Sequence, residues 1–326
     1  MELQSKIIDT PPLPAATVVM LRDTDAGMEV FLLKRHGLSD VLGGAYVFPG
    51  GKLDPRDAEL DGAAHLDQAP ADLLESLNET ELDAVTAASL YVAALREVFE
   101  ESGILFVHGA TGELATRAGV LLRAGHGFDE MLAQMSMRLQ TRGVLPWSRW
   151  ITPTAPTLMS KRFDTRFFVS AVPAGQIAGH DNHEATESVW LTPRAALQRY
   201  WAREIELAPP QIMSLAHLSH YNHVQDVLQA ARNRRPPVVA PEPFIQDGLR
   251  VICYPGDERH SISERALPGP TRLTYRDKRF EPADGFEALF TPAPEALAAP
   301  LSGTRTHAQV ERQRDCERDP LDRESG

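Results

Sequence analysis

The chain has 326 residues, of which 43% are hydrophobic and 24% are charged, and its formal net charge is −12 at pH 7. A chain of this length and composition can bury a substantial core, as one large domain or as one domain with extensions. No apolar run is long enough to span a bilayer, and the acidic balance argues against a protein that coats nucleic acid.

Two further features bear on the compartment. Residues 1–14 lack the basic start and apolar core of a secretory signal. The two cysteines, Cys253 and Cys316, lie far apart, in surroundings of different composition. These features predict a reduced, cytoplasmic protein without a metal–thiolate site.

The first part of the chain predicts three strands. Residues 16–21 and 29–35 are apolar and indicate two strands joined by a turn. Residues 45–48 predict a third strand, which leads into a loop that contains Gly50 and Gly51. Adjacent glycines let a backbone adopt positive φ and come close to a ligand.

A helical region follows an irregular stretch. Residues 71–78 predict a short helix, and residues 81–102 predict a long helix with Thr80 as its N-cap and Gly103 as its stop. The long helix carries an apolar stripe at helical spacing, which consists of Leu82, Val85, Ala88 and Val92. A packing surface within the chain is sufficient for this stripe, and a homodimer contact is the alternative.

The middle of the chain alternates strands and helices. We expect strands over residues 104–107, 147–151, 163–172 and 188–191. We expect helices over residues 114–124, 128–141, 192–203 and 210–231.

The composition changes at residues 233–237, which we interpret as a linker. Strands over residues 249–254 and 271–275 then predict a small β extension that spans residues 236–291. Residues 292–326 are rich in alanine, proline and charge, and we expect this tail to be disordered.

Three carboxylates, Glu97, Glu100 and Glu101, lie near the end of the long helix. Offsets of three and four residues bring all three onto one helix face. In a partly desolvated cleft, two carboxylates about 5 Å apart repel by roughly 3 kcal/mol, and a hard divalent cation removes that cost. A solvated acidic face is the alternative. The glycine loop upstream favours a site for Mg²⁺ or Mn²⁺ and a phosphate.

The glycine loop and the acidic helix together resemble the Nudix box, G-x5-E-x7-R-E-U-x-E-E-x-G-U, in which U is apolar. Gly51 matches the first glycine, and residues 96–104 match the second half without a mismatch. Two features depart from the pattern: Asp57 replaces the first glutamate, and the spacer is lengthened to residues 58–95. The resemblance implies an α/β Nudix fold, in which a mixed β-sheet is sandwiched between helices.

A long insertion inside the box is typical of a branch that resembles the peroxisomal coenzyme A diphosphatases and their bacterial relatives. Other segments are similar to that branch, namely residues 30–35, 43–51, 150–153, 162–168 and 207–211. The resemblance places a Nudix hydrolase domain at residues 10–235, with an insertion within the box at 58–90 and a helical insertion at 108–145.

The resemblance also implies roles for the box residues. Glu97, Glu100 and Glu101 are expected to bind Mg²⁺ or Mn²⁺, and Glu100 is also expected to take part in catalysis. The metal polarises a phosphoryl oxygen and lowers the pKa of a bound water. Arg96 is expected to brace the glutamates rather than to contact the substrate.

Residues outside the acidic helix complete the predicted site. Glu184 is the first candidate for the general base and Glu187 is the second, with an ordinary surface carboxylate as the alternative. Gly50 and Gly51 are expected to bring the backbone close to the metal or a phosphate, and Arg35 is expected to contact a phosphate of the substrate.

Three further residues have open roles. Arg162 and Arg166 flank Asp164, and they are candidates for a phosphate contact, with a local ion pair to Asp164 as the alternative for one of them. Asp57 is either an outer metal ligand or a surface aspartate.

These features predict metal-dependent hydrolysis of a diphosphate in a small nucleotide derivative. The branch favours coenzyme A or acyl-CoA, with 3′,5′-ADP and a phosphopantetheine as products. NADH, FAD, dinucleoside polyphosphates and capped RNA 5′ ends stay open as substrates, and we expect no other nucleic acid and no membrane as partners. A non-catalytic, nucleotide-sensing Nudix domain is the alternative of another class, although such domains usually lose box glutamates.

Overall fold

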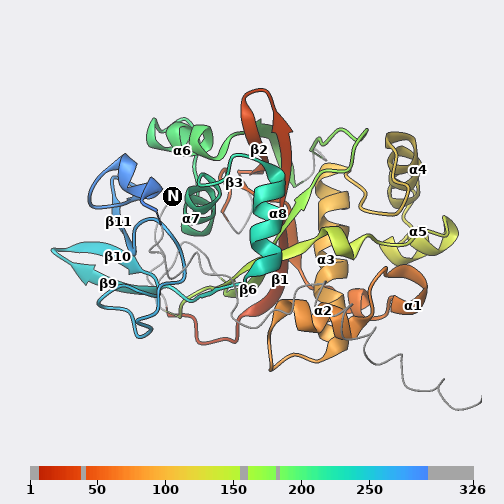
Figure 1. Ribbon diagram of the computed structural model, residues 1–326, viewed down its shortest axis with the longest axis horizontal. Coiled ribbons are helices and arrows are strands. Elements are labelled where there is room, and N and C mark those ends of the chain that lie inside the picture. The colour runs from red at the N-terminus through yellow and green to blue at the C-terminus, as the bar shows by residue number, and fades with distance from the viewer. Residues whose placement is uncertain (1–6, 38–41, 155–160, 181–183, 293–326) are drawn as a thin grey trace, which may run out of the picture.

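The computed structural model describes residues 7–37, 42–154, 161–180 and 184–292 of the protein. A mixed eight-stranded sheet lies at its centre, with the order β3-β2-β1-β6-β5-β8, with β4 paired to β1 and β7 paired to β2 (Figure 1). Its strands are β1 (Leu13–Thr24), β2 (Gly27–Arg35), β3 (Tyr46–Val47), β4 (Gly50–Lys52), β5 (Leu145–Ile151), β6 (Phe163–Ala171), β7 (Ala185–Leu191) and β8 (Val238–Val239). The predicted α/β class is confirmed, and the predicted tail, apart from residue 292, lies outside the described residues.

Helices cover both faces of the sheet (Figure 1). The first layer contains α1 (Gly62–His65), α2 (Pro70–Leu77), α3 (Ala84–Ser102), α4 (Gly112–Arg123) and α5 (Phe128–Gln134). The second layer contains α6 (Pro193–Trp201), α7 (Pro209–Leu218) and α8 (Val224–Asn233). Short 3-10 turns occur at η1 (Pro55–Ala58), η2 (Thr141–Gly143) and η3 (Phe286–Phe290). Within the described residues, no helix is both long and apolar enough to cross a membrane.

The strand β1 separates two hydrophobic cores because successive side chains point to opposite faces of a sheet. Val18 and Met20 pack in one core with Leu90 of α3. Val19 and Leu21 pack in the other core with residues of α6, α7 and α8. The sheet is therefore buried on both faces.

The strand β1 also positions the glycines. One of its edges pairs in parallel with β6. Its other edge pairs with β2 at Leu21–Thr24 and with β4 at Ala15–Thr17, so the sheet divides there. The glycine segment predicted as a loop is thus the strand β4, which the absence of side chains at Gly50 and Gly51 concealed.

The helix α3 is continuous, which confirms that the insertion lengthens the acidic helix backwards. It begins later than predicted because Asp83, and not Thr80, is the N-cap, and its carboxylate accepts the Thr86 N–H at 2.8 Å. Gly103 ends the helix with a φ of 72°, as predicted. Val85 is 59% exposed, so its assignment to the apolar stripe was wrong.

Two elements in the middle of the chain differ from the prediction. Residues 104–107 do not form a strand, because the Leu105 backbone exchanges hydrogen bonds of 2.8 and 2.9 Å with the Gln176 side chain. The helix predicted over residues 128–141 ends at Gln134, and Ser136 then adopts a φ of 52°.

The helix predicted over residues 210–231 is two helices, α7 and α8. The first N–H of α8, from Val224, donates to the Asp23 carboxylate of β1 at 3.0 Å. This contact helps to fix the start of α8 against the sheet, independently of α7.

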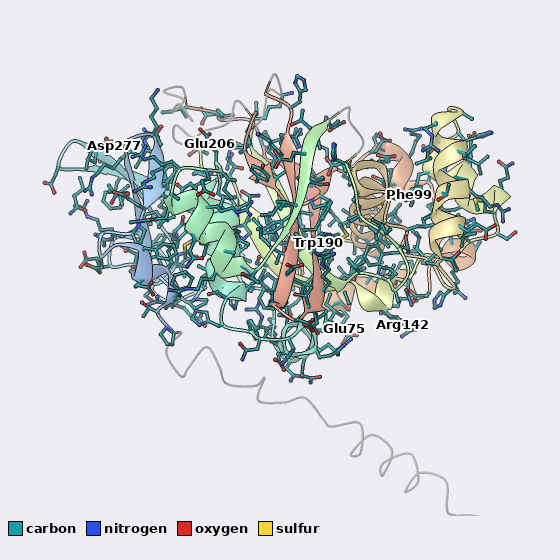
Figure 2. All side chains as sticks on the ribbon, turned by 90° about the horizontal axis from the view of Figure 1, so that it is seen from above. Glu75, Phe99, Arg142, Trp190, Glu206 and Asp277 are labelled. Atoms are coloured by element: carbon teal, nitrogen blue, oxygen red, sulfur yellow. The ribbon has the colours of Figure 1, made fainter. Side chains whose placement is uncertain are left out.

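The C-terminal extension, residues 236–291, is integrated with the main fold. β8 pairs with β5, so the predicted linker leads directly into the central sheet. The remaining strands form a four-stranded antiparallel sheet of β9 (Glu242–Gln246), β10 (Leu249–Cys253), β11 (Arg272–Arg276) and β12 (Arg279–Glu281). Leu273 and Phe280 of this sheet belong to the core that also contains α6 and α7. Figure 2 shows Asp277 of the extension and Phe99 of α3 on opposite sides of Trp190 in the central sheet.

Candidate active site

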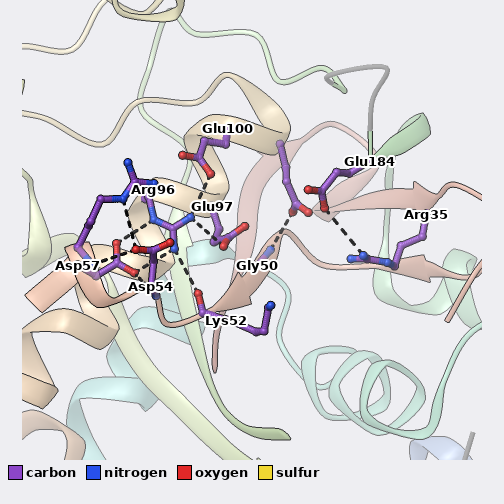
Figure 3. Close-up of polar contacts among 11 residues, drawn as sticks. Arg35, Gly50, Lys52, Asp54, Asp57, Arg96, Glu97, Glu100 and Glu184 are labelled. Carbon is purple, nitrogen blue, oxygen red and sulfur yellow. Dashed lines mark hydrogen bonds and ion pairs between the residues drawn. The ribbon is translucent and has the colours of Figure 1, made fainter. Parts of the chain in front are cut away.

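Arg96 of α3 is the centre of an ion-pair network beside β4 (Figure 3). Its Nε and Nη2 donate to the two carboxylate oxygens of Asp57 at 2.8 and 3.0 Å. Its Nη1 donates to Glu97 at 2.9 Å and to Glu100 at 3.0 Å, and its Nη2 also reaches the Lys52 carbonyl at 3.2 Å. One guanidinium thus holds two of the glutamates in place and ties α3 to β4 and η1, as expected of a bracing residue.

Asp57 lies in η1, and its side chain is only 3% exposed. The local turn fixes its position, because Asp57 accepts the Asp54 N–H at 2.8 Å while Asp54 caps the same turn by accepting the Arg56 N–H at 2.9 Å. The alternative of a surface aspartate is therefore wrong. A contact between Asp57 and a metal stays a prediction.

The strand β4 brings its backbone directly against α3. The Gly50 N–H donates to the Glu101 carboxylate at 2.9 Å. A Cβ on Gly50, whose φ is +154°, would collide with the backbone of Ala16, and a Cβ on Gly51 would collide with the Glu97 carboxylate. Both positions therefore require glycine, the first for the sheet and the second for the glutamate.

Burial makes the glutamates of α3 difficult to ionise. Burial, with smaller contributions from the Glu97 and Glu184 carboxylates, raises the pKa of Glu101 to about 8, against the lowering effect of the Gly50 N–H. Burial also raises the pKa values of the other two glutamates, and Arg96 offsets this in part. Perturbed carboxylates that raise one another's pKa are typical of a functional site that attracts a cation.

Arg35 and Glu184 face each other at the ends of β2 and β7 (Figure 3). The Arg35 Nη2 lies 3.9 Å from the Glu184 Oε2. The Arg35 Nε is buried and has no hydrogen-bond partner among the described residues. Glu184 is near enough to contribute to the raised pKa values of the three glutamates, whereas Glu187 lies 3.5 Å from Lys34 at the surface.

A cavity of about 360 Å³ opens beside this network. Five residues that the sequence marks as site residues line it, namely Arg35, Gly50, Gly51, Glu97 and Glu184. Much of the remaining wall is apolar and aromatic, as is typical of a pocket for a nucleotide-sized ligand.

The other box residues lie around this cavity rather than in its wall. Arg96 and Glu100 line a neighbouring cavity of about 240 Å³. Glu101 is buried behind Gly50, to which it is hydrogen-bonded. Glu97 is thus the glutamate of α3 that faces the larger cavity.

The structure also places residues in the cavity wall that the sequence analysis did not assign to the site. They include Lys161, Gln211 of α7, and Arg250 and Ile252 of β10. Gln211 ends the segment 207–211, which is similar to the coenzyme A branch, and this similarity was a usable signal. Arg250 and Ile252 carry no local motif, because their place depends on how the extension packs against the second core.

Arg162 and Arg166 do not line the cavity. The Arg166 side chain is 4% exposed and binds Glu79 at 2.9 and 2.5 Å and Asp164 at 3.0 Å. Arg162 donates to the Thr152 carbonyl at 2.9 Å. Of the two roles considered, the structure places Arg166 in the ion pair with Asp164.

The residues proposed as metal ligands, Glu97, Glu100 and Glu101, carry the type of donor atom that a divalent cation requires. Glu97 and Glu100 point to Arg96, and Glu101 points to Gly50. In the part of the chain that the structure describes, no three His, Cys, Asp or Glu side chains converge as a metal-binding group. The donors are nevertheless carboxylate oxygens with raised pKa values, and hard divalent cations prefer such donors. Metal ligation by these glutamates stays a prediction.

The mixed sheet between two helical layers, the glycine strand and the arginine-braced glutamate helix define a Nudix hydrolase domain. Residues 9–218 match the family model described as the NUDT19 Nudix domain, and the chain belongs to this family. It is therefore a Nudix pyrophosphohydrolase, an enzyme that hydrolyses diphosphate bonds.

Known proteins agree with this assignment. The chain is 29% identical over 272 residues to the acyl-coenzyme A diphosphatase NUDT19 of Xenopus laevis, which covers 71% of this chain and 70% of that protein. It is 26% identical over 268 residues to the putative nudix hydrolase 7 of Caenorhabditis elegans, and this match covers 81% of this chain and 79% of that protein. The crystal structure of a NUDIX hydrolase from Alicyclobacillus acidocaldarius superimposes with a TM-score of 0.54 and 26% identity, over 68% of this chain and 97% of that one.

Proposed function

We propose that the protein hydrolyses the diphosphate bond of coenzyme A or acyl-CoA to give 3′,5′-ADP and phosphopantetheine or its acyl derivative. The observation that carries this proposal is one cavity whose wall contains both the charged group of Arg35, Glu97 and Glu184 and extensive apolar surface. The charged part suits a diphosphate, and the apolar part suits the bulky groups on either side of it. The name of the Xenopus laevis relative, an acyl-CoA diphosphatase, supports the same substrate.

Glu97, Glu100 and Glu101 are the residues that would hold Mg²⁺ or Mn²⁺. When bound, such a cation supplies Lewis-acid polarisation of a phosphoryl oxygen and lowers the pKa of a water molecule. Arg96 is a positioning residue in this proposal, because it binds Glu97 and Glu100 and lies outside the wall of the larger cavity.

Glu184 is the proposed general base. It lines the cavity and lies close enough to the glutamates of α3 to raise their pKa values, and both observations support a role in accepting a proton from an attacking water. Arg35 is proposed to bind a phosphate oxygen, because it lines the same cavity and its Nε has no partner among the described residues.

A substrate panel tests the proposal. Coenzyme A, acetyl-CoA, NADH, FAD, a dinucleoside polyphosphate and a capped RNA are incubated with the protein and Mg²⁺ or Mn²⁺. We expect the highest kcat/KM for coenzyme A or acetyl-CoA, with 3′,5′-ADP as a product. A higher kcat/KM for another nucleotide would reject this substrate and leave the hydrolase class unchanged.

Two predictions about the setting of the enzyme accompany this proposal. The cytoplasmic location is proposed from cysteine usage alone. The second prediction is a homodimer, in which the exposed part of α3 around Val85 would contact a second copy of the chain. Fractionation of cells and light scattering of the purified protein test these two predictions.

A further inference from the structure

Part of the cavity wall lies beyond the Nudix domain that the family model matches. That match ends at residue 218, whereas Ile252 of β10 and Phe280 of β12 line the cavity from the C-terminal extension. Phe280 is held firmly, because its backbone exchanges hydrogen bonds of 2.8 and 2.9 Å with the Tyr200 hydroxyl of α6. The extension therefore shapes the cavity that also contains Glu97.

Gln211 lines the same cavity and carries a buried acceptor that is unpaired in the described part of the chain. The residue is 6% exposed, lies in the first turn of α7 and lines the cavity. Its Oε1 is buried and has no hydrogen-bond partner among the described residues. The preceding residues, Pro209 and Pro210, have no backbone N–H that could donate to it. Because an unpaired buried acceptor is costly, a donor on a bound molecule would stabilise the complex.

We propose that Gln211, Ile252 and Phe280 form a subsite for an apolar group that carries an N–H donor. The Gln211 Oε1 accepts this hydrogen bond, and the two apolar side chains cover the body of the group. The inference rests on the proposed function, because both ends of coenzyme A have this chemistry. Adenine carries an amino group on an aromatic ring, and the pantetheine arm carries amide N–H groups along a largely apolar chain. The C-terminal extension is then an element of substrate specificity.

Binding of product fragments tests the subsite without turnover. The affinities of 3′,5′-ADP and of pantetheine for the full-length, metal-free protein are measured by titration calorimetry. Gln211→Met keeps the length of the side chain and removes the acceptor, and Gln198→Met makes the same change at an exposed position of α6. We expect Gln211→Met to lower the affinity for one fragment by about five- to tenfold, which corresponds to the loss of one hydrogen bond. Ile252→Ser should weaken the same fragment, and Gln198→Met should leave both affinities unchanged.

The two fragments distinguish the occupants of the subsite. A loss confined to 3′,5′-ADP places adenine there, and a loss confined to pantetheine places the acyl-carrying arm there, and either result supports the subsite. Three results would overturn it: no binding of either fragment to the unmodified protein, unchanged binding to Gln211→Met, or equal loss of both fragments with a lowered Tm. If binding depends on Gln211 while coenzyme A is not hydrolysed, the proposed function fails and the subsite stands.

Discussion

The Gly50 N–H donates to the Glu101 carboxylate over 2.9 Å, and this bond joins two segments that are 51 residues apart in the chain. Gly50 lies on β4 and Glu101 lies on α3, so the insertion within the box does not separate its two halves in space. The added residues, 58–90, form α1, α2 and the first part of α3, beside the site rather than between its parts. The glycine strand and the glutamate helix therefore still meet directly.

Glu101 makes the stability of the metal-free protein depend on pH. Its pKa is raised from 4.5 to about 8 in the folded state. Between these two values the unfolded chain releases the proton while the folded protein retains it, so stability falls as pH rises through this window. Glu101→Gln removes this dependence. We expect the Tm of Glu101→Gln, relative to the unmodified protein, to increase steadily from pH 4.5 to pH 8.

Calorimetry across this pH range in the presence of a chelator provides the measurement. Glu113→Gln, at an exposed position in the first turn of α4, is the matched control and should show a constant Tm difference. A Tm difference between Glu101→Gln and the unmodified protein that does not change with pH would contradict the proposed ionisation of Glu101.

The two glycines of β4 should respond differently to alanine. In Gly51→Ala the new Cβ meets the Glu97 carboxylate, which can rotate away, so we expect kcat to fall at least tenfold with little change in Tm. In Gly50→Ala the Cβ meets the rigid Ala16 backbone, so we expect a loss of about 1–3 kcal/mol in the free energy of unfolding. Chemical denaturation and steady-state kinetics measure both effects.

Gly143→Ala is the control for this pair, because its added Cβ has no heavy atom within 4 Å. It should leave both kcat and stability close to those of the unmodified protein. Normal activity of Gly51→Ala would show that the position of the Glu97 carboxylate is unimportant.

The buried pair of Asp57 and Arg96 should be important for stability and for activity. Their side chains are 3% and 12% exposed, and loss of one charge leaves the other buried without a full partner. We expect Asp57→Asn to lower the free energy of unfolding by about 3 kcal/mol. We also expect kcat to fall about tenfold, because the brace on Glu97 and Glu100 is weakened. Asp25→Asn, in the exposed turn between β1 and β2, should change neither quantity, and an equally small effect of Asp57→Asn would exclude the bracing role.

A general base at Glu184 predicts a defect in rate rather than in binding. Glu184→Gln should lower kcat by about 10²- to 10⁴-fold and leave KM within a few-fold of its original value. Glu187→Gln, three residues along the chain and paired with Lys34, should retain activity. If kcat falls in Glu187→Gln and is unchanged in Glu184→Gln, Glu187 and not Glu184 is the general base.

Local patterns were sufficient to predict the parts of the fold with strong side-chain periodicity. The strands β1, β2, β5 and β6 and the C-terminal end of α3 at Gly103 follow from apolar runs and a glycine stop. The strand β4 was not predicted, because Gly50 and Gly51 have no side chains to form a pattern and its pairing with β1 is a tertiary contact. Residues 104–107 look like a strand in sequence, but the Gln176 side chain binds the Leu105 backbone and only an isolated bridge forms at Val107.

The candidate site was predictable where its residues share one segment. Glu97 was found from helical spacing, and the bracing role of Arg96 from the resemblance to the Nudix box. The burial of Asp57 was hidden by the insertion that follows it. Gln211 and Ile252 come from elements far apart in the chain, and the second hydrophobic core brings both to the cavity. Such a wall is determined by packing, so short-range sequence patterns do not reveal it.

The central claim is that the glutamates of α3 hold a divalent cation for diphosphate hydrolysis. The most direct test compares coenzyme A turnover with Mg²⁺ or Mn²⁺ in the unmodified protein, Glu97→Gln, Glu101→Gln and the exposed control Glu113→Gln. Our account predicts metal-dependent release of 3′,5′-ADP that falls at least about 100-fold in the first two variants, as for groups that stabilise a transition state, and is unchanged in the control. Full turnover by folded Glu97→Gln and Glu101→Gln, or equal turnover in excess chelator, would contradict it.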